Sequence, residues 1–517
     1  MSKLHPNNKP PKSNKSKTRI LVVTPEITYL PTGMGNLAQR MHAKAGGMAD
    51  VSASLVKALY DQGADVHVAL PNYRKMFHMD MKEIFDGEVE RCVSKVIPEK
   101  RIHLAEDRIF YHRSKVYDAM ENQNTALAFQ REVINNIIPR VQPDLIHCND
   151  WMTGLIPAAA KRLGIPCLFT CHNIHSERLT MAHIEDKGID AADFWHNLYF
   201  TDKPENYDEA RESKPVDLLA TGIFASDHVN SVSPTFLYEV VEGRHDFVPD
   251  AIRNELANKV YSGRASGILN APDESLKPQI DSYLEHNYSS KNFVKGKALN
   301  KADLQEKAGL DIDPTAPIMF WPSRLDPMQK GCQLLADIMY QTISDYSHLG
   351  LQIVIVASGS FSQHFHEIIA HHGLGGKVAM CDFDESLSRI AYAGSDFMLM
   401  PSRFEPCGLP QMVAPKYGSI PIVHDTGGLH DTIHHLHHDG KLGNGFRFEH
   451  YSSGGLRWAI DEALKFYQWE PTLKNKTIRR IMKESDIFFN HQTTAAAYIE
   501  RYEQILGRDV VDTLHNV

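Results

Sequence analysis

The feature of this sequence that most constrains its fold is the regular alternation of short apolar runs with segments long enough to form helices. Short apolar runs rich in β-branched residues are typical of buried strands. In the first half of the chain they occupy residues 19–24, 66–70, 144–148 and 166–170. In the second half they occupy residues 317–321, 351–357, 377–381, 396–400 and 420–423. Because helical patterns separate the runs, as in the segment that starts at Gly46, each half is predicted to form a parallel sheet covered by helices.

The chain has 517 residues, which is too many for one hydrophobic core. A polar stretch at residues 275–307 separates the two halves and is the expected domain junction. We therefore predict an α/β protein with two Rossmann-like, doubly wound parallel-sheet domains that face each other, with ligands at the carboxyl ends of the strands. The expected parts are a disordered tail at 1–18, an N-terminal domain at 19–290 and a C-terminal domain at 291–517 that includes a last helix at 490–506.

The composition argues against several classes of function. The formal net charge is -9, which leaves no excess of Lys and Arg to neutralise a nucleic-acid backbone. No stretch approaches the roughly 18–20 apolar residues of a membrane span, and the Lys-, Asn- and Pro-rich start lacks the apolar core of a secretory signal. The 7 Cys residues have no regular spacing and fit a reducing compartment. We expect a cytoplasmic protein without nucleic-acid or membrane partners.

A Lys followed by two glycines precedes the first long helical pattern, at Lys44, Gly46 and Gly47. The glycines allow a ligand to approach the backbone closely, and a helix N-terminus offers free N–H groups and a positive dipole end to an anion. The turn therefore suits a diphosphate. Taken alone, the pattern is more often a glycine turn beside a solvated lysine.

Charged residues also follow two apolar runs of the second half. Arg324 and Lys330 come after the run at 317–321, and Glu405 comes after the run at 396–400. The carboxyl ends of parallel strands form the ligand edge of a doubly wound sheet, so these side chains are candidates for binding. By itself, Glu405 would be read as a surface carboxylate.

Three histidines at four-residue spacing, His430, His434 and His438, would share one face of a helix and could bind a transition metal. No Cys or carboxylate nearby completes a metal site. We therefore expect an exposed polar helix or loop there, and no metal.

Several motifs of the chain resemble those of bacterial glycogen synthases and plant starch synthases, in the same order and at similar spacing over residues 19–510. They are KAGGMADV, CNDWMTGL, FTCHN, SVSPT, SRLDPMQKG, PSRFEPCGLPQ and DTGGLHDT. The resemblance implies the GT-B architecture and a retaining hexosyltransferase without cofactor or metal. It implies transfer of glucose from ADP-glucose or UDP-glucose to the non-reducing end of an α-1,4-glucan.

The resemblance also implies roles for individual residues. The implied catalytic set is His172, Arg324, Lys330 and Glu405. The implied substrate-binding set is Lys44, Gly46, Gly47, Asp150, Asn173, Asn270, Cys407, Gly408, Leu409, Gly427 and Gly428. In this reading Arg324 and Lys330 neutralise the diphosphate, His172 lies beside the transferred sugar and Glu405 contacts its hydroxyls.

The chain departs from the family pattern at five places. Met152 replaces a histidine, residues 174–177 and 271–273 differ from the usual motifs, and residues 28–42 look like an insertion. Lys330 also lies one residue further from Arg324 than in most glycogen synthases. The donor residues are intact, so the departures concern the acceptor. One alternative is a related retaining enzyme that acts on an oligosaccharide or a surface polysaccharide precursor. A non-catalytic glucan-binding regulator is the other alternative, and the intact phosphate residues argue against it.

Overall fold

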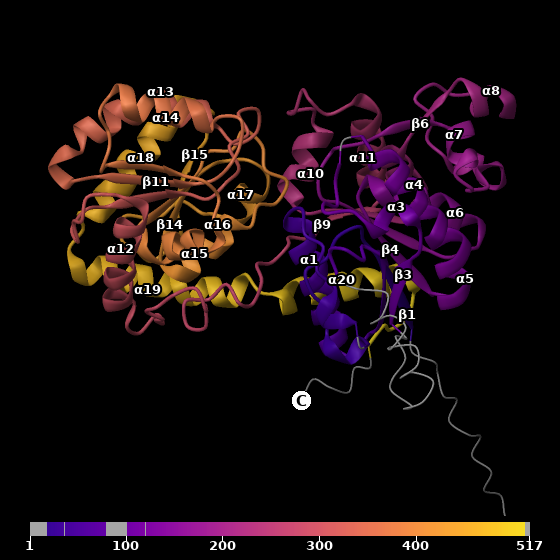
Figure 1. The fold of residues 1–517 in the computed structure, drawn as a ribbon, viewed down its shortest axis with the longest axis horizontal. Coiled ribbons are helices and arrows are strands. Elements are labelled where there is room, and N and C mark those ends of the chain that lie inside the picture. The colour runs from indigo at the N-terminus through magenta and orange to yellow at the C-terminus, as the bar shows by residue number, and fades with distance from the viewer. Residues whose placement is uncertain (1–17, 36, 79–100, 119, 512–517) are drawn as a thin grey trace, which may run out of the picture.

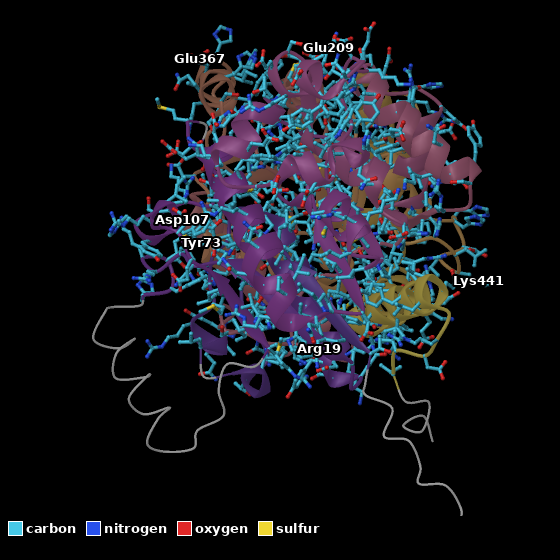
Figure 2. The ribbon with its side chains drawn as sticks, turned by 90° about the vertical axis from the view of Figure 1, so that its right-hand side faces the viewer. Arg19, Tyr73, Asp107, Glu209, Glu367 and Lys441 are labelled. Atoms are coloured by element: carbon cyan, nitrogen blue, oxygen red, sulfur yellow. The ribbon has the colours of Figure 1, made fainter. Side chains whose placement is uncertain are left out.

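The computed structural model describes residues 18–35, 37–78, 101–118 and 120–511. Figure 1 shows two lobes side by side, the first formed by the indigo and magenta part of the chain and the second by the orange part. Figure 2 looks onto the first lobe and places Arg19, at the start of its first strand, and Glu209 at opposite ends of the molecule.

Each lobe is built on a parallel sheet. Within the described residues, the first sheet has seven strands in the order β3-β2-β1-β4-β5-β8-β9 and the second has six in the order β12-β11-β10-β13-β14-β15. The strands of the first lobe are β1 (Arg19–Val23), β2 (Asp65–Pro71), β3 (Ile102–Ala105), β4 (Leu145–Asn149), β5 (Cys167–Cys171), β8 (His228–Ser231) and β9 (Ala265–Gly267), with a separate antiparallel pair β6 (Arg178–Thr180) and β7 (Pro215–Asp217). Those of the second are β10 (Ile318–Trp321), β11 (Gln352–Val356), β12 (Val378–Cys381), β13 (Phe397–Met400), β14 (Ile420–His424) and β15 (Phe446–Phe448). The predicted doubly wound parallel sheets are confirmed.

Helices cover both sheets. The first lobe contains α1 (Gly47–Asp61), α3 (Arg108–Tyr111), α4 (Asn122–Glu132), α5 (Ile138–Val141), α6 (Ile156–Arg162), α7 (Met181–Asp186), α8 (Tyr207–Glu212), α9 (Leu218–Ala225), α10 (Pro234–Val241) and α11 (Asp250–Tyr261). Later in the chain come α12 (Phe293–Ala308), α13 (Cys332–Asp345), α14 (Ser362–His371), α15 (Glu385–Gly394), α16 (Pro410–Val413), α17 (Gly427–Thr432), α18 (Ser453–Tyr467), α19 (Pro471–Phe488) and α20 (His491–Leu506). Among the described residues, we find no helix with the length and hydropathy needed to span a bilayer.

The central strands form because their side chains are apolar on both faces. The side chains of Ile20 to Val23 in β1 are fully buried, as expected for a strand with helices above and below it. β1 pairs in parallel with β2 on one side and β4 on the other. The carboxyl ends of these strands therefore lie along one edge, where the loops that precede α1 and follow β4 emerge.

The polar stretch expected as a domain junction is partly a helix. Its last part forms α12, which packs against α15 of the second lobe. The buried face of α12 carries polar side chains: the ammonium of Lys297 donates to the carbonyl oxygens of Ala393 at 3.0 Å and Ser395 at 2.6 Å. The helix at residues 293–308 was not evident in the sequence, because an apolar pattern does not reveal a core helix that buries lysines and amides. The domain limit at residue 290 stays a prediction.

The last helix, α20, packs on the first lobe although the sequence assigned it to the second domain. Figure 1 shows α19 running along the lower side of the second lobe and α20 lying against the first lobe beside α1. Tyr498 and Tyr502 belong to the apolar core of the first lobe. The Tyr502 hydroxyl is hydrogen-bonded to Nδ1 of His147 on β4 at 2.8 Å, and the Tyr498 hydroxyl accepts from Asn230 on β8 at 2.9 Å. These buried partners correct the assignment of α20.

Candidate active site

The glycine turn predicted to receive phosphate leads into α1. Gly46 is the extended residue before the helix and Gly47 is its first residue. The backbone N–H groups of Ala45 and Gly46 donate to one oxygen of Glu26, Oε2, at 2.6 and 3.0 Å. The ammonium of Lys44 lies 2.8 Å from a carboxylate oxygen of Asp50 in the first turn. The carboxylate of Glu26 thus fixes the backbone of the turn through these two hydrogen bonds. The turn lies at the N-terminus of a 15-residue helix, which is the positive end of the helix dipole.

A second group of predicted residues follows β4 and β5. The buried carboxylate of Asp150 accepts hydrogen bonds from the backbone N–H of His172 at 2.7 Å and from the side-chain amide of Asn173 at 2.9 Å. Asp150 has a φ of 57°, a left-handed conformation that is rare outside glycine. Strain of this kind persists where surrounding contacts fix the backbone, and here the loop after β5 supplies them.

The protonation of this group follows from its burial. Burial raises the pKa of Asp150 to about 7, and nearby Glu26 contributes to the rise. Burial lowers the pKa of His172 to about 4, so its imidazole is neutral at pH 7. Asn149 donates its amide to the Val23 carbonyl, and its oxygen therefore accepts from Nε2 of His172 at 2.8 Å. This arrangement places the proton of His172 on Nε2.

In the second lobe, the structure brings Lys330 and Glu405 together. The ammonium of Lys330 lies 2.6 Å from Oε2 of Glu405, and both side chains are buried. The hydroxyl of Ser402 donates to the same carboxylate oxygen at 3.0 Å. Because the pair is desolvated, neither charge can be removed without leaving the other uncompensated.

The loop that carries Glu405 is locked to the start of α17. The N–H of Gly428 donates to the carbonyl of Glu405 at 2.9 Å. Gly427 has a φ of +45°, and a Cβ there would lie 2.1 Å from the same carbonyl oxygen. Gly408 has a φ of +74° in the turn between Cys407 and α16, so this turn also depends on glycine.

The two lobes meet at these loops. A Cβ at Gly47, on α1 of the first lobe, would lie 3.6 Å from the side chain of Leu409 in the second. The backbone of Asn270 is hydrogen-bonded to the thiol of Cys407. The side-chain oxygen of Asn270 is buried and has no hydrogen-bond partner within the described residues. Residues predicted from separate motifs therefore converge between the lobes.

Two predicted cations are not joined to this cluster. The Arg324 side chain is exposed, and among the described residues no hydrogen bond or ion pair involves its guanidinium. Lys44 contacts Asp50, not a residue of the second lobe. The catalytic and binding roles of all these residues stay predictions.

The three histidines at four-residue spacing do not share a helix. α17 ends at Thr432, so only His430 is helical, and its ring is 2.6 Å from a carboxylate oxygen of Asp425. His434 and His438 are exposed in the loop beyond. Within the part of the chain that the structure describes, no group of three possible metal ligands comes together.

Sequence reasoning missed Glu26, Asn149 and Ser402, each of which contacts a predicted residue. All three follow or end a strand, at the carboxyl edge that had drawn attention to Arg324 and Glu405. The position of a polar residue at a strand end was therefore the available signal.

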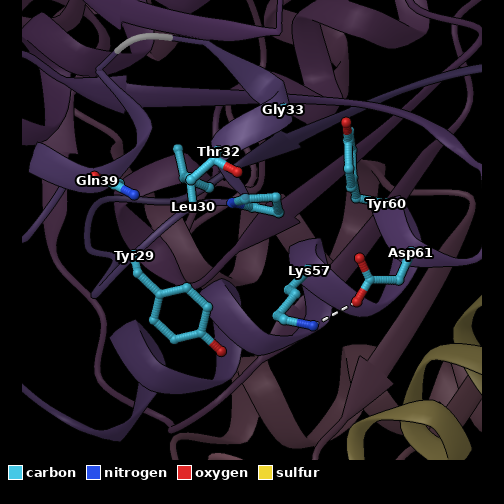
Figure 3. Close-up of a pocket in the computed structure, with 9 residues that line it drawn as sticks. Tyr29, Leu30, Thr32, Gly33, Gln39, Lys57, Tyr60 and Asp61 are labelled. Atoms are coloured by element: carbon cyan, nitrogen blue, oxygen red, sulfur yellow. Dashed lines mark hydrogen bonds and ion pairs between the residues drawn. The ribbon is translucent and has the colours of Figure 1, made fainter.

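A separate pocket of about 470 Å³ lies at the other end of α1 (Figure 3). Tyr29 and Leu30 line it from the loop after β1, and Lys57, Tyr60 and Asp61 line it from α1. Lys57 and Asp61 form an ion pair with each other. Because α1 is about 20 Å long, the pocket is distinct from the glycine turn.

Models of known protein families match both lobes of the chain. The model of the starch synthase catalytic domain matches residues 19–251, and the model of glycosyl transferases group 1 matches residues 303–483. A glycogen synthase of Clostridium beijerinckii is 32% identical over 502 residues, which cover 90% of this chain and 97% of that protein. A glycogen synthase of Bacillus subtilis is 30% identical, with 91% and 97% covered.

Solved structures of other proteins have the same two-lobe fold. The catalytic domain of starch synthase IV from Arabidopsis thaliana, bound to ADP and acarbose, superposes with a TM-score of 0.75 at 25% identity and covers 95% of this chain and 100% of its own. Sucrose-phosphate synthase from Thermosynechococcus elongatus shares the fold with a TM-score of 0.56 at 17% identity. The two sheets and the loops that meet between them define a glycosyltransferase of the GT-B architecture. Within that class, the chain belongs to the glycogen and starch synthase family.

Proposed function

We propose that this protein transfers glucose from a nucleoside diphosphate glucose to the non-reducing end of an α-1,4-glucan with retention of configuration. The observation that carries the proposal is the convergence of the Gly47 end of α1 with the loop of Glu405 and Leu409 from the other lobe. A phosphate-sized anion bound at the N-terminus of α1 would face the lobe that carries the buried ion pair of Lys330 and Glu405.

The proposed chemistry uses charge on the leaving group. As the glycosidic bond to the diphosphate breaks, negative charge grows on the phosphate oxygens, and fixed cations and N–H donors lower the barrier. Arg324, Lys330 and the N-terminus of α1 supply them. Glu405 accepts hydrogen bonds from sugar hydroxyls, and the neutral His172 lies beside the transferred sugar.

We take ADP-glucose as the first donor to test. The Arabidopsis relative was solved with ADP and acarbose, and the two bacterial relatives carry the name glycogen synthase. UDP-glucose remains the alternative donor. The length of the glucan and the cytoplasmic location stay predictions.

The decisive experiment offers the purified protein ADP-glucose or UDP-glucose, each with and without glycogen. The expected result is glucose incorporation into glycogen that depends on both substrates and is retained by Lys441→Ala, a change at an exposed lysine. Release of nucleotide without incorporation into any α-1,4-glucan would instead favour a different acceptor, such as a surface polysaccharide precursor.

A further inference from the structure

Glu26 occupies an unusual position for a carboxylate, beneath the turn that is proposed to bind phosphate. It follows β1 and only 2% of its surface is exposed. Both backbone donors of the turn, Ala45 and Gly46, reach the same carboxylate oxygen, Oε2. Two charge-assisted bonds to one atom fix the backbone just before the first free N–H groups of α1.

The carboxylate of Glu26 faces titratable and charged groups from every element around it. They are Lys44 and Asp50 at the start of α1, Tyr73 after β2, Tyr117 before α4 and Asp150 after β4. The Tyr117 hydroxyl is hydrogen-bonded to Glu26. The nearby cation, Lys44, is already paired with Asp50. Two buried carboxyl groups, Glu26 and Asp150, thus share one region below the turn.

We propose that Glu26 is a positioning residue for the nucleotide donor: it shapes the glycine turn through Ala45 and Gly46, and its charge makes donor binding depend on pH. This inference rests on the proposed function, because it takes the turn to be the diphosphate site. Glu26 itself does not touch the donor.

The geometry separates the two effects of Glu26. Since both N–H groups donate to one oxygen, the single carbonyl oxygen of glutamine can accept both, and Glu26→Gln keeps the shape of the turn while it removes the charge. Glu26→Ala removes both the acceptor oxygen that shapes the turn and the charge. A negative charge below the turn opposes a bound diphosphate, so the charge and the shape act on donor affinity in opposite directions.

The pH dependence has a definite sign. Burial raises the pKa of Glu26, and the pKa of Asp150 is raised to about 7, partly by the charge of Glu26. As pH increases through the pKa of Asp150, the region beside Glu26 becomes more negative, and diphosphate binding should weaken. Without the Glu26 charge, Asp150 loses its proton at a lower pH. The midpoint of the pH dependence of diphosphate binding should therefore move to a lower pH.

The test is calorimetric titration of the parent, Glu26→Gln, Glu26→Ala and a control, Glu500→Gln at an exposed site on α20, with ADP and with UDP from about pH 6 to about pH 8. We expect Glu26→Ala to weaken binding roughly tenfold, the equivalent of about 1.4 kcal/mol. Glu26→Gln should bind at least as tightly as the parent at the upper pH, with the midpoint of the pH dependence lowered. The control should match the parent.

Two outcomes would overturn the inference. One is Glu26→Gln binding as weakly as Glu26→Ala with the pH midpoint of the parent, and the other is parental binding by all variants. If Glu26→Ala fails to fold, as thermal unfolding would show, Glu26→Gln alone still decides the role of the charge. Because the titration contains no glucan, a parent that binds nucleotide but never elongates glycogen would contradict the proposed function and leave this inference intact.

Discussion

At the scale of single residues, the pairing of Lys330 with Glu405 changes how both should respond to mutation. The sequence suggested separate duties, Lys330 on the diphosphate and Glu405 on the sugar. The structure places their charged atoms 2.6 Å apart and buried. Arg324, with its exposed side chain, has no such partner among the described residues. The two cations should therefore differ in their effect on stability even though both are predicted to neutralise the donor.

We predict that Lys330→Ala destabilises the protein by about 3–5 kcal/mol, because it leaves Glu405 buried and uncompensated. Arg324→Ala should leave stability unchanged. Each should lower turnover roughly 10²- to 10³-fold, the scale for loss of one preorganised donor. Denaturant unfolding and steady-state transfer measure the two effects, with Lys441→Ala as the exposed control.

The combination of Lys330→Ala with Glu405→Gln sharpens this prediction. Residues in direct contact do not contribute additively, so the double variant should lose less stability than the sum of the single variants. Additive losses would show that the two side chains do not interact in solution.

Asp150 gives a prediction for pH. Its folded pKa of about 7 lies above the ordinary aspartate value of 3.8, so between these values the folded state holds a proton that the unfolded state has lost. The protein is therefore stabilised below pH 4, and this contribution is lost as pH rises to about 7. Asp150→Asn should reduce the fall of the thermal unfolding midpoint over this range. An unchanged slope would contradict the assigned pKa.

At the scale of elements, the sequence located the central strands well, but it gave no run for β3, β8, β9 or β15 and did not reveal the polar helix α12. β1, β2, β4 and β5 lie within a residue or two of the predicted runs, because strands buried on both faces are continuously apolar. α12 escaped notice since its buried face includes Lys297, whose ammonium replaces apolar packing with hydrogen bonds to carbonyl groups.

The same comparison holds for the candidate site. Glu405 could be named because it follows a strand, and Lys44 because it stands beside two glycines before a helix; both also match motifs. The contacts within the site could not be named, since the pairing of Lys330 with Glu405 and the hold of Glu26 on the turn depend on side-chain positions. The place of α20 also could not be read from the chain order, because it depends on the direction that the chain takes across the short connection after α19.

The packing of α20 leads to a prediction at this scale. Tyr502→Phe removes the hydroxyl bonded to Nδ1 of His147, which is fully buried. Leaving a buried polar atom without a partner should cost about 1–3 kcal/mol. Tyr261→Phe, at a tyrosine that is 82% exposed, is the matched control and should have no effect. Equal denaturation midpoints for the two variants would show that α20 does not depend on this bond.

At the scale of the whole molecule, the lobes are joined through α10 and α17, which face each other in Figure 1. The hydroxyls of Ser233 and Thr235, at the start of α10, both donate to Asp431 on α17. Glu239, further along α10, accepts from the N–H of Gly427 at 3.1 Å. Each helix therefore places a carboxylate at the N-terminus of the other. Because the start of α17 is also hydrogen-bonded to the loop of Glu405, these contacts connect that loop to the first lobe.

This connection leads to the last prediction, that the Asp431 contacts support closure of the lobes on the donor. The residues predicted to bind phosphate lie on both lobes and would have to converge when the donor binds, so the radius of gyration from X-ray scattering should decrease on addition of nucleotide sugar. Asp431→Ala removes two partly buried hydroxyl bonds across the lobes, so a larger part of the binding energy must be used to order the lobes. It should raise the KM for the donor several-fold and reduce the change in radius, with a smaller effect on kcat. Asp439→Ala, which removes an aspartate from the exposed loop after α17, is the matched control and should behave as the parent. The contacts of Asp431 with Ser233 and Thr235 would have no role in donor binding if Asp431→Ala matched Asp439→Ala in both KM and scattering.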